Sequence, residues 1–209
     1  MRVLENAPMR SGLVVGVGMA TSMALTFVQP GADLNVLFAR GLTWSQFLSG
    51  VTNNRESWER NARRAEVPDD LVRTLRAVRE HVKVLIVAED WCKDSVNTVP
   101  YIAKLTSSAG LETRVINRQL GHDLMNIHRT PDGRLATPTV VLLRNGRDAA
   151  SWVERPAGLQ EWFLAESVEI GSEQDNKRHQ QLEFWHEGDQ GKTTVAEIVR
   201  LAVQIASKR

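Results

Sequence analysis

The sequence predicts an α/β domain with a central mixed sheet flanked by helices, because its apolar segments require both parallel and antiparallel strands. A β-branched run at 81–87 is followed by apolar residues at helical spacing and then by a strand-like run at 111–116. A strand–helix–strand unit crosses over right-handed and makes a parallel pair. A further strand at 137–143 leads into Asn145-Gly146, a strong hairpin signal, which adds an antiparallel pair.

Two helices are expected before the sheet, and the folded part is expected to begin near residues 34–42. Thr43 can cap the first helix. The apolar residues of that helix lie mostly on one side: Trp44, Phe47, Leu48, Val51 and Trp58. Pro68-Asp69-Asp70 opens the second helix, with proline and acids in its first turn.

Further helices are expected between and after the strands. Residues 119–128 favour a short helix, and the stretch from 159 to 185 is helical at first and very polar at 171–181. Thr193 opens a last amphipathic helix. Five tryptophans are expected to anchor the core, namely Trp44, Trp58, Trp152, Trp162 and Trp185.

Composition excludes several classes of function. The 209 residues carry a formal net charge of +1, and arginines interleaved with acids are typical of solvated helix faces rather than of a nucleic-acid patch. The single cysteine forbids an internal disulfide. The five histidines show no ligand pattern and there is no second cysteine, so we expect neither a metal site nor a cofactor.

The N-terminal segment, residues 1–33, is expected to stand apart from the fold. Its apolar run at 13–28 is shorter than the roughly 20 residues that a membrane-spanning helix needs. It can be a signal peptide, a membrane anchor, or part of a start assigned too early, upstream of Met19 or Met23. We expect a cytoplasmic protein, with export or membrane anchoring through 13–28 as the alternative.

The lone cysteine, Cys92, lies where the first strand passes into a helix. A thiol on the first turn of a helix meets unpaired backbone N–H groups and the positive end of the helix dipole. Both favour the thiolate, which is the nucleophilic form. The alternative is a small core hydrophobe, the commoner role of a free cysteine.

This order of elements, with Trp91-Cys92 after the first central strand and Thr137-Pro138 before the hairpin, resembles the thioredoxin fold. It is most similar to a bacterial thioredoxin-like branch with the motif Glu-Asp-Trp-Cys-x-Asp, here residues 89–94. That branch also carries an Arg-Pro pair after the last strand, matched by Arg155-Pro156. The resemblance implies a thioredoxin-like domain over 34–209 with helical N- and C-terminal extensions. It also implies a cis Pro138 packed against Cys92.

The departure from ordinary thioredoxins is Ser95, which stands where Cys-x-x-Cys has its second thiol. A serine hydroxyl does not resolve a mixed disulfide, so a single-chain dithiol cycle is excluded. We expect a monothiol redox protein whose Cys92 forms mixed disulfides that an external thiol resolves. Its partners would be protein or low-molecular-weight thiols and disulfides, and thiol–disulfide oxidoreductase activity stays open. The alternative is a redox-inactive binding module that uses the groove near Trp91 and Pro138.

The expected roles at the site follow from the chemistry of each side chain. Cys92 is the nucleophile and Ser95 either donates a hydrogen bond to the thiolate or is a tolerated first-turn residue. Lys93 either favours the thiolate by its charge or is simply exposed. Trp91 shields the site or packs in the core, and the Thr137 backbone is expected to bind an extended substrate beside Pro138.

Three carboxylates near Cys92 have further expected roles. Asp94, in the first helical turn, is expected to stabilise the helix through its dipole. Glu89 and Asp90 are candidates for proton transfer, although a solvated strand end is an equal alternative.

Overall fold

The computed structural model describes residues 34–165 and 167–207. Its sheet has four strands in the order β2-β1-β3-β4. The strands are β1 (Lys83–Val87), β2 (Thr113–Ile116), β3 (Thr139–Arg144) and β4 (Arg147–Val153). β1 pairs parallel with β2 and antiparallel with β3, and β3 pairs antiparallel with β4. The predicted mixed sheet flanked by helices is therefore confirmed.

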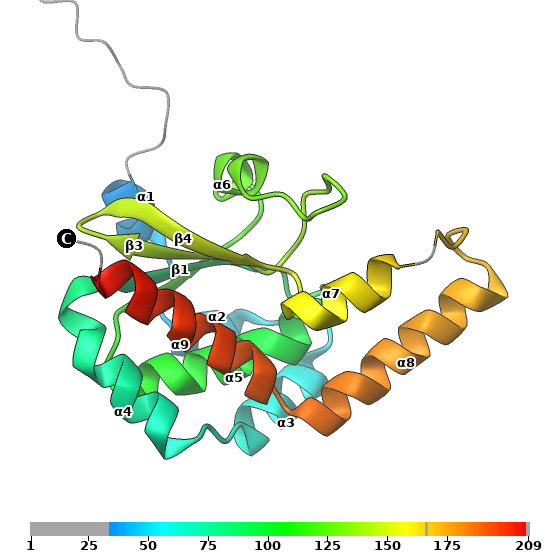
Figure 1. Cartoon of the computed structure of the whole chain (residues 1–209), viewed down its shortest axis with the longest axis horizontal. Coiled ribbons are helices and arrows are strands. Elements are labelled where there is room, and N and C mark those ends of the chain that lie inside the picture. Colours follow the sequence, from blue (N-terminus) through cyan, green and yellow to red (C-terminus); the bar gives the residue numbers. More distant parts are fainter. Residues whose placement is uncertain (1–33, 166, 208–209) are drawn as a thin grey trace, which may run out of the picture. The chain divides into compact units, whose positions relative to one another are not determined.

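Helices cover both faces of this sheet (Figure 1). Before β1 the chain forms α1 (Leu34–Arg40), α2 (Trp44–Gly50), α3 (Arg55–Arg64), α4 (Asp69–Val78) and the 3-10 helix η1 (Arg79–His81). Between the strands lie α5 (Lys93–Ala109) and α6 (His122–Ile127), and after β4 follow α7 (Ala157–Leu164), α8 (Glu173–Asp189) and α9 (Lys192–Ser207).

The period-2 alternation of β1 divides the core into two layers. Val84 and Ile86 pack in the larger apolar cluster, with α4, α5 and α9, whereas Leu85 and Val87 pack in the smaller one, with α1 and α6. All four side chains are fully buried. Because both faces of β1 are covered, the sequence of the strand is a continuous apolar run. The strand ends at the loop that contains Cys92.

One sequence expectation about the first helices is wrong. The predicted helix through Trp58 is two helices, because the chain leaves α2 at Val51 and begins α3 at Arg55. Asn54 adopts a left-handed conformation with φ of 52° between them. The predicted cap is present, since Thr43 and Gln46 form a capping box.

Several element boundaries also differ from those predicted. His81 belongs to η1, so β1 begins at Lys83, and β2 begins at Thr113 rather than at 111. The polar stretch 171–181 contains the first half of α8, which Ser172 caps through its hydroxyl. A polar segment can form a helix when contacts with the rest of the protein hold it.

The structure contributes one finding about membranes. None of the helices within residues 34–165 and 167–207 combines the length and apolar character that crossing a membrane requires. The predicted signal or anchor at 1–33 lies outside the described residues.

Candidate functional site

Cys92 is the N-cap residue of α5, at the carboxyl end of β1, as the sequence predicted. Its side chain is partly exposed. The thiol donates a hydrogen bond to the Thr137 carbonyl oxygen, with Sγ and O 3.1 Å apart. The fold therefore brings the cysteine of one loop against the backbone of another, 45 residues later in the chain.

The second loop contains the cis peptide bond between Thr137 and Pro138 that the resemblance implied. Thr137 is buried, and the Pro138 carbonyl accepts a hydrogen bond of 2.8 Å from the Glu154 backbone N–H. This bond ties the proline loop to the end of β4, so the strand pair β3–β4 positions the group that faces Cys92.

Two other predicted site residues make no contact with the sulfur. Ser95 is fully buried, and its hydroxyl has no hydrogen-bond partner among the described residues, so it donates no bond to Cys92. Lys93 forms an ion pair with Glu183 of α8, so that carboxylate neutralises part of its positive charge. Trp91 is 52% exposed, which excludes the core-packing alternative for this side chain.

Asp94, in the first turn of α5, forms a bidentate ion pair with Arg155. Its two carboxylate oxygens accept hydrogen bonds of 2.9 and 2.8 Å from the Arg155 guanidinium. Both side chains are mostly buried, at 14% and 5% exposure. Such bidentate pairs are the strongest charge-assisted contacts of proteins. Asp94 lies in the first turn of α5, as predicted, and it forms in addition a long-range ion pair that the sequence did not indicate.

Arg155 is held in place by a tight turn at the end of β4. Glu154 has a left-handed φ of 65°, and the Arg155 N–H bonds the Val153 carbonyl at 2.8 Å, two residues back. Left-handed backbone is costly for a residue with a side chain. The turn is anchored by the buried Glu154 carboxylate, which binds Arg134 through both oxygens at 3.0 Å. The contact with Glu154 raises the pKa of Arg134.

Glu89 and Asp90 have structural partners. Glu89 accepts a bond of 2.7 Å from the Arg118 N–H. Asp90 accepts four bonds from the backbone and side chains of Thr52 and Asn53. Partial burial would raise the pKa of Asp90, but these bonds outweigh it and lower the pKa to about 2. Asp90 therefore stays ionised at neutral pH and fixes the loop between α2 and α3.

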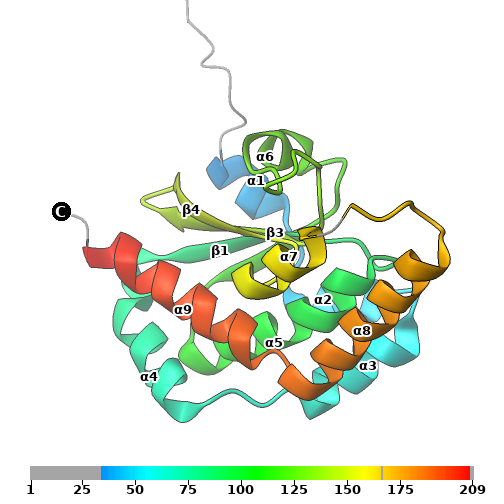
Figure 2. The ribbon, with the colours of Figure 1, turned by 45° about the vertical axis from the view of Figure 1, so that its right-hand side comes forward.

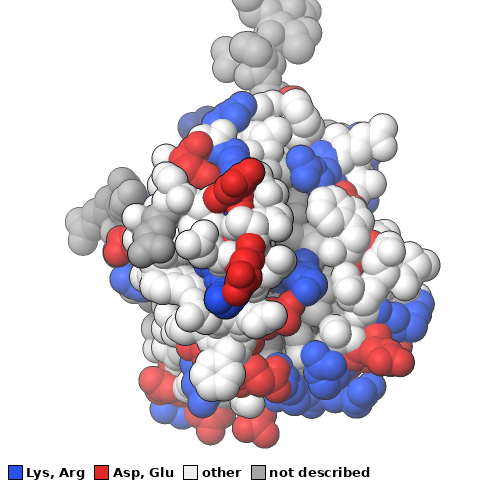
Figure 3. Space-filling view, turned by 90° about the vertical axis from the view of Figure 1, so that its right-hand side faces the viewer, with Lys and Arg blue, Asp and Glu red and all other residues white. Residues whose placement is uncertain are grey.

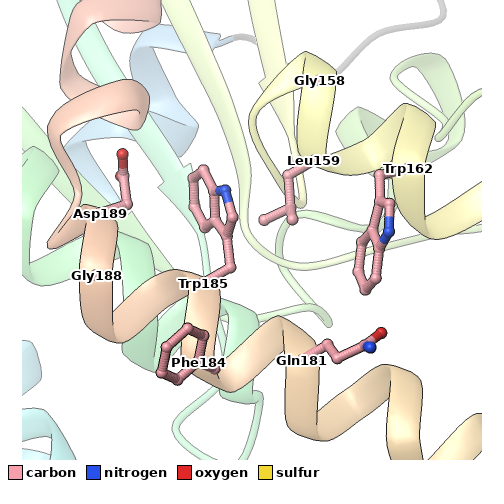
Figure 4. A pocket seen from close by; sticks show the side chains of 8 residues that line it. All are labelled: Gly158, Leu159, Trp162, Gln181, Phe184, Trp185, Gly188 and Asp189. Atoms are coloured by element: carbon pink, nitrogen blue, oxygen red, sulfur yellow. The ribbon is translucent and has the colours of Figure 1, made fainter.

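A separate pocket lies between α7 and α8, and it corrects two of the tryptophan expectations. Trp58 and Trp152 are buried as predicted, but Trp162 is 42% exposed and lines a cavity of about 690 Å³ with Trp185 (Figure 4). Phe184, on α8, lines the same cavity. On the face where α7 ends and α8 begins, acidic and basic side chains are interspersed rather than gathered by sign (Figure 3).

The residues that the structure describes contain no group of three or more His, Cys, Asp or Glu side chains placed to hold a metal ion. Sequence reasoning missed Arg155 as a partner of Asp94, and it missed His186, a buried residue of α8 whose Nε2 lies 3.8 Å from Asp94 Oδ1. In the sequence, the Arg-Pro pair of the resemblance points to Arg155, but it does not identify Asp94 as the partner of Arg155.

Comparisons with known proteins agree with the fold. A family model described as thioredoxin matches residues 41–179, more than half of the chain. The fold is similar to a crystal structure of a protein of unknown function from Pseudomonas aeruginosa, with a TM-score of 0.64, 18% identity, and coverage of 83% of this chain and 99% of the other. An HIV epitope scaffold gives a TM-score of 0.61, 17% identity and the same two coverages. No protein with a curated description matches the chain.

Proposed function

Because this chain belongs to the thioredoxin family, we propose that it is a monothiol protein that exchanges disulfides through Cys92. One observation carries the proposal: the partly exposed Cys92 caps α5 and lies 3.1 Å from the carbonyl that precedes cis-Pro138. The chain has no other cysteine, so the resolving thiol comes from outside. The comparisons do not favour the alternative of a redox-inactive binding module.

The reaction is an exchange of sulfur bonds. The Cys92 thiol loses its proton to solvent, and the thiolate attacks one sulfur of a disulfide RSSR′, which forms Cys92–S–S–R and releases R′S⁻. R′S⁻ takes up a proton. An external thiolate R″S⁻ then attacks the R sulfur, releasing RSSR″ and the Cys92 thiolate. The unpaired N–H groups at the start of α5 stabilise the negative sulfur before and after each step.

The surroundings of Cys92 suit a disulfide on an extended chain or a small thiol compound. Trp91 offers an exposed apolar surface beside the sulfur, and the backbone of Thr137 lies directly against it. The external thiol that completes the cycle is abundant in a reducing compartment such as the cytoplasm, where we place the reaction.

The test is the formation and fate of a mixed disulfide with glutathione disulfide, measured by intact-protein mass spectrometry. Native protein is expected to gain one glutathionyl group at Cys92 and to keep it until free glutathione is added. Ser95→Cys is the matched variant, because a second thiol at that position would release the glutathione and leave an internal disulfide. A native protein that gains no adduct until denaturant is added would overturn the proposal.

A further inference from the structure

The second half of α8 lies against the start of the helix that carries Cys92, as Figure 2 shows for α8 beside α3 and α5. Glu183 pairs with Lys93, and His186 faces Asp94. Glu187 pairs with Arg64 of α3, and this contact lowers the pKa of Glu187. The match to the family model ends at residue 179, so these three residues of α8 lie beyond the matched part.

His186 is the least explained of these residues. Its side chain is 4% exposed, and its Nε2 has no hydrogen-bond partner among the described residues. The 3.8 Å between Nε2 and Asp94 Oδ1 is too long for a hydrogen bond but close enough for a strong charge interaction if the ring is protonated. A buried imidazole whose free nitrogen faces a carboxylate can respond to the charge of that carboxylate.

The ion-pair network that contains Asp94 holds one more carboxylate than guanidinium groups. Asp94 and Glu154 share Arg155, and Glu154 and Asp132 share Arg134, so three carboxylates meet two guanidinium groups. Beside this network, Lys93 pairs with Glu183 and Arg64 with Glu187, and Arg60 of α3, which donates a hydrogen bond to the Ser57 hydroxyl, also acts on Glu187. The imidazolium form of His186 would supply the missing positive charge.

We propose that His186 is a positioning residue for Cys92: its protonation balances the charge of Asp94 and so increases the fraction of Cys92 present as thiolate. This proposal rests on the proposed function, because it regulates the same sulfur. Asp94 lies two residues after Cys92 in the first turn of α5, where an unbalanced carboxylate disfavours a second negative charge. Arg155 offsets this effect only in part, since it is shared with Glu154.

The first test is a double-mutant cycle read by the rate of Cys92 alkylation with iodoacetamide from pH 5 to 9. His186→Gln is expected to slow alkylation roughly three- to tenfold at the acid end, the size expected from removing one partly shielded charge. Asp94→Asn is expected to speed it, and His186→Gln is expected to have no further effect in that background. His179→Gln is the matched control, because His179 lies on the same helix, its polar contacts among the described residues are with Asp175, and its ring packs edge-on against Phe163.

A wild-type profile in His186→Gln overturns the proposal, and so does an effect of His186→Gln that persists in the Asp94→Asn background. Because the readout is alkylation, it is independent of turnover. If the protein is glutathionylated but the effects of His186→Gln and Asp94→Asn on alkylation are independent, this inference alone is overturned. If the two effects depend on each other but no glutathione adduct forms, the proposed function alone is overturned.

A second measurement needs no substitution at the ion pair, so it holds even if Asp94→Asn fails to fold. The protein is alkylated at Cys92 either with iodoacetate, which adds a carboxylate, or with iodoacetamide, which adds a neutral group of similar size. Coupling is reciprocal, so the NMR titration midpoint of the His186 ring is expected to lie at higher pH in the carboxymethyl protein. Equal midpoints in the two forms would contradict the proposal.

Discussion

Helices α5 and α8 each contain 17 residues and meet near Cys92, but they are held by different forces. Most residues of α5 are buried, among them Val99, Ile102 and Leu105, at no exposure. α8 buries only Asp175, Leu182 and His186. It joins α3 and α5 through the ion pairs of Glu187 and Glu183, and its apolar contacts are with α7, in the small cluster of Leu182, Leu159 and Phe163. Apolar burial therefore fixes α5, the helix that carries the nucleophile, whereas charged contacts join α8 to α5 and α3.

The difference separates the determinants of the fold from those of the site. Burial of apolar surface is large and insensitive to small changes in charge, so the position of Cys92 is stable. Exposed ion pairs contribute little to stability, but they set the electrostatic potential at a nearby ionisable group. We therefore expect substitutions of the charged residues of α8 to preserve the fold and to change the reactivity of Cys92.

The largest effect is expected from Arg155→Ala, which tests whether charged contacts on α5 can matter as much as its apolar core. The substitution removes the bidentate partner of the mostly buried Asp94 carboxylate, whereas Glu154 keeps its bonds with Arg134 and Gln160. Loss of one member of a buried pair costs about 3–5 kcal/mol of unfolding free energy. Urea denaturation measures it, with Arg200→Ala as the exposed control, whose nearest carboxylate lies 3.9 Å away. A loss no larger than that of the control would show that the pair does not stabilise the domain.

The next effect compares one buried leucine from each helix. Leu105→Ala in α5 is expected to cost about 2–5 kcal/mol, because the fully buried site cannot collapse around the cavity. Leu182→Ala in α8 is expected to cost roughly 1–2 kcal/mol, because it packs only in a small cluster with Leu159 and Phe163 that can relax. Urea denaturation of both variants measures the two losses of unfolding free energy. Equal losses would show that α8 belongs to the main core.

A smaller effect is expected from Asp90→Asn, which probes the charged anchor of the loop before α3. The bonds that lower the pKa of Asp90 to about 2 stabilise the folded state above the unfolded pKa of about 3.9. This contribution is lost as the pH falls from about 4 towards 2. We expect Asp90→Asn to cost on the order of 1 kcal/mol at pH 7 and to flatten the stability curve between pH 4 and 2. Thermal unfolding between pH 4 and 2 measures this change in stability. Parallel curves of stability against pH for variant and wild type would contradict the lowered pKa of Asp90.

Local sequence patterns were sufficient for the elements that apolar burial determines. β1, α5, β2 and the β3–β4 hairpin follow from periodicity and from Asn145-Gly146, and Cys92 lies at the predicted passage from strand to helix. The break at Val51–Asn54 was missed because Asp90, far along the chain, binds Thr52 and Asn53. A long-range polar contact of this kind leaves no periodic signal.

The site was predictable in its nucleophile and its proline, but not in its electrostatics. The motif and the resemblance identified Cys92 and Pro138, which the structure places on adjoining loops through Thr137. Asp94 and Arg155 are 61 residues apart, and nothing local marks them as partners. His186 lies in a helix whose few apolar residues, Leu182, Phe184 and Trp185, define no single buried face, so no pattern in that segment indicates that His186 is buried.

The smallest effect in stability, and the most direct test of how α8 is held, is its response to salt. Glu183→Gln removes the pair with Lys93, whose two side chains are largely exposed, and is expected to cost at most about 0.5–1 kcal/mol. Hydrogen exchange should nevertheless reveal faster opening of α8 in 1 M salt than in 0.1 M salt, because screening weakens such pairs. Exchange in α5 should not change. Glu173→Gln is the matched control, since its partner Lys177 lies on α8 itself and links it to no other element. Protection of α8 that is indifferent to both salt and Glu183→Gln would mean that apolar contacts with α7, rather than charges, hold this helix beside Cys92.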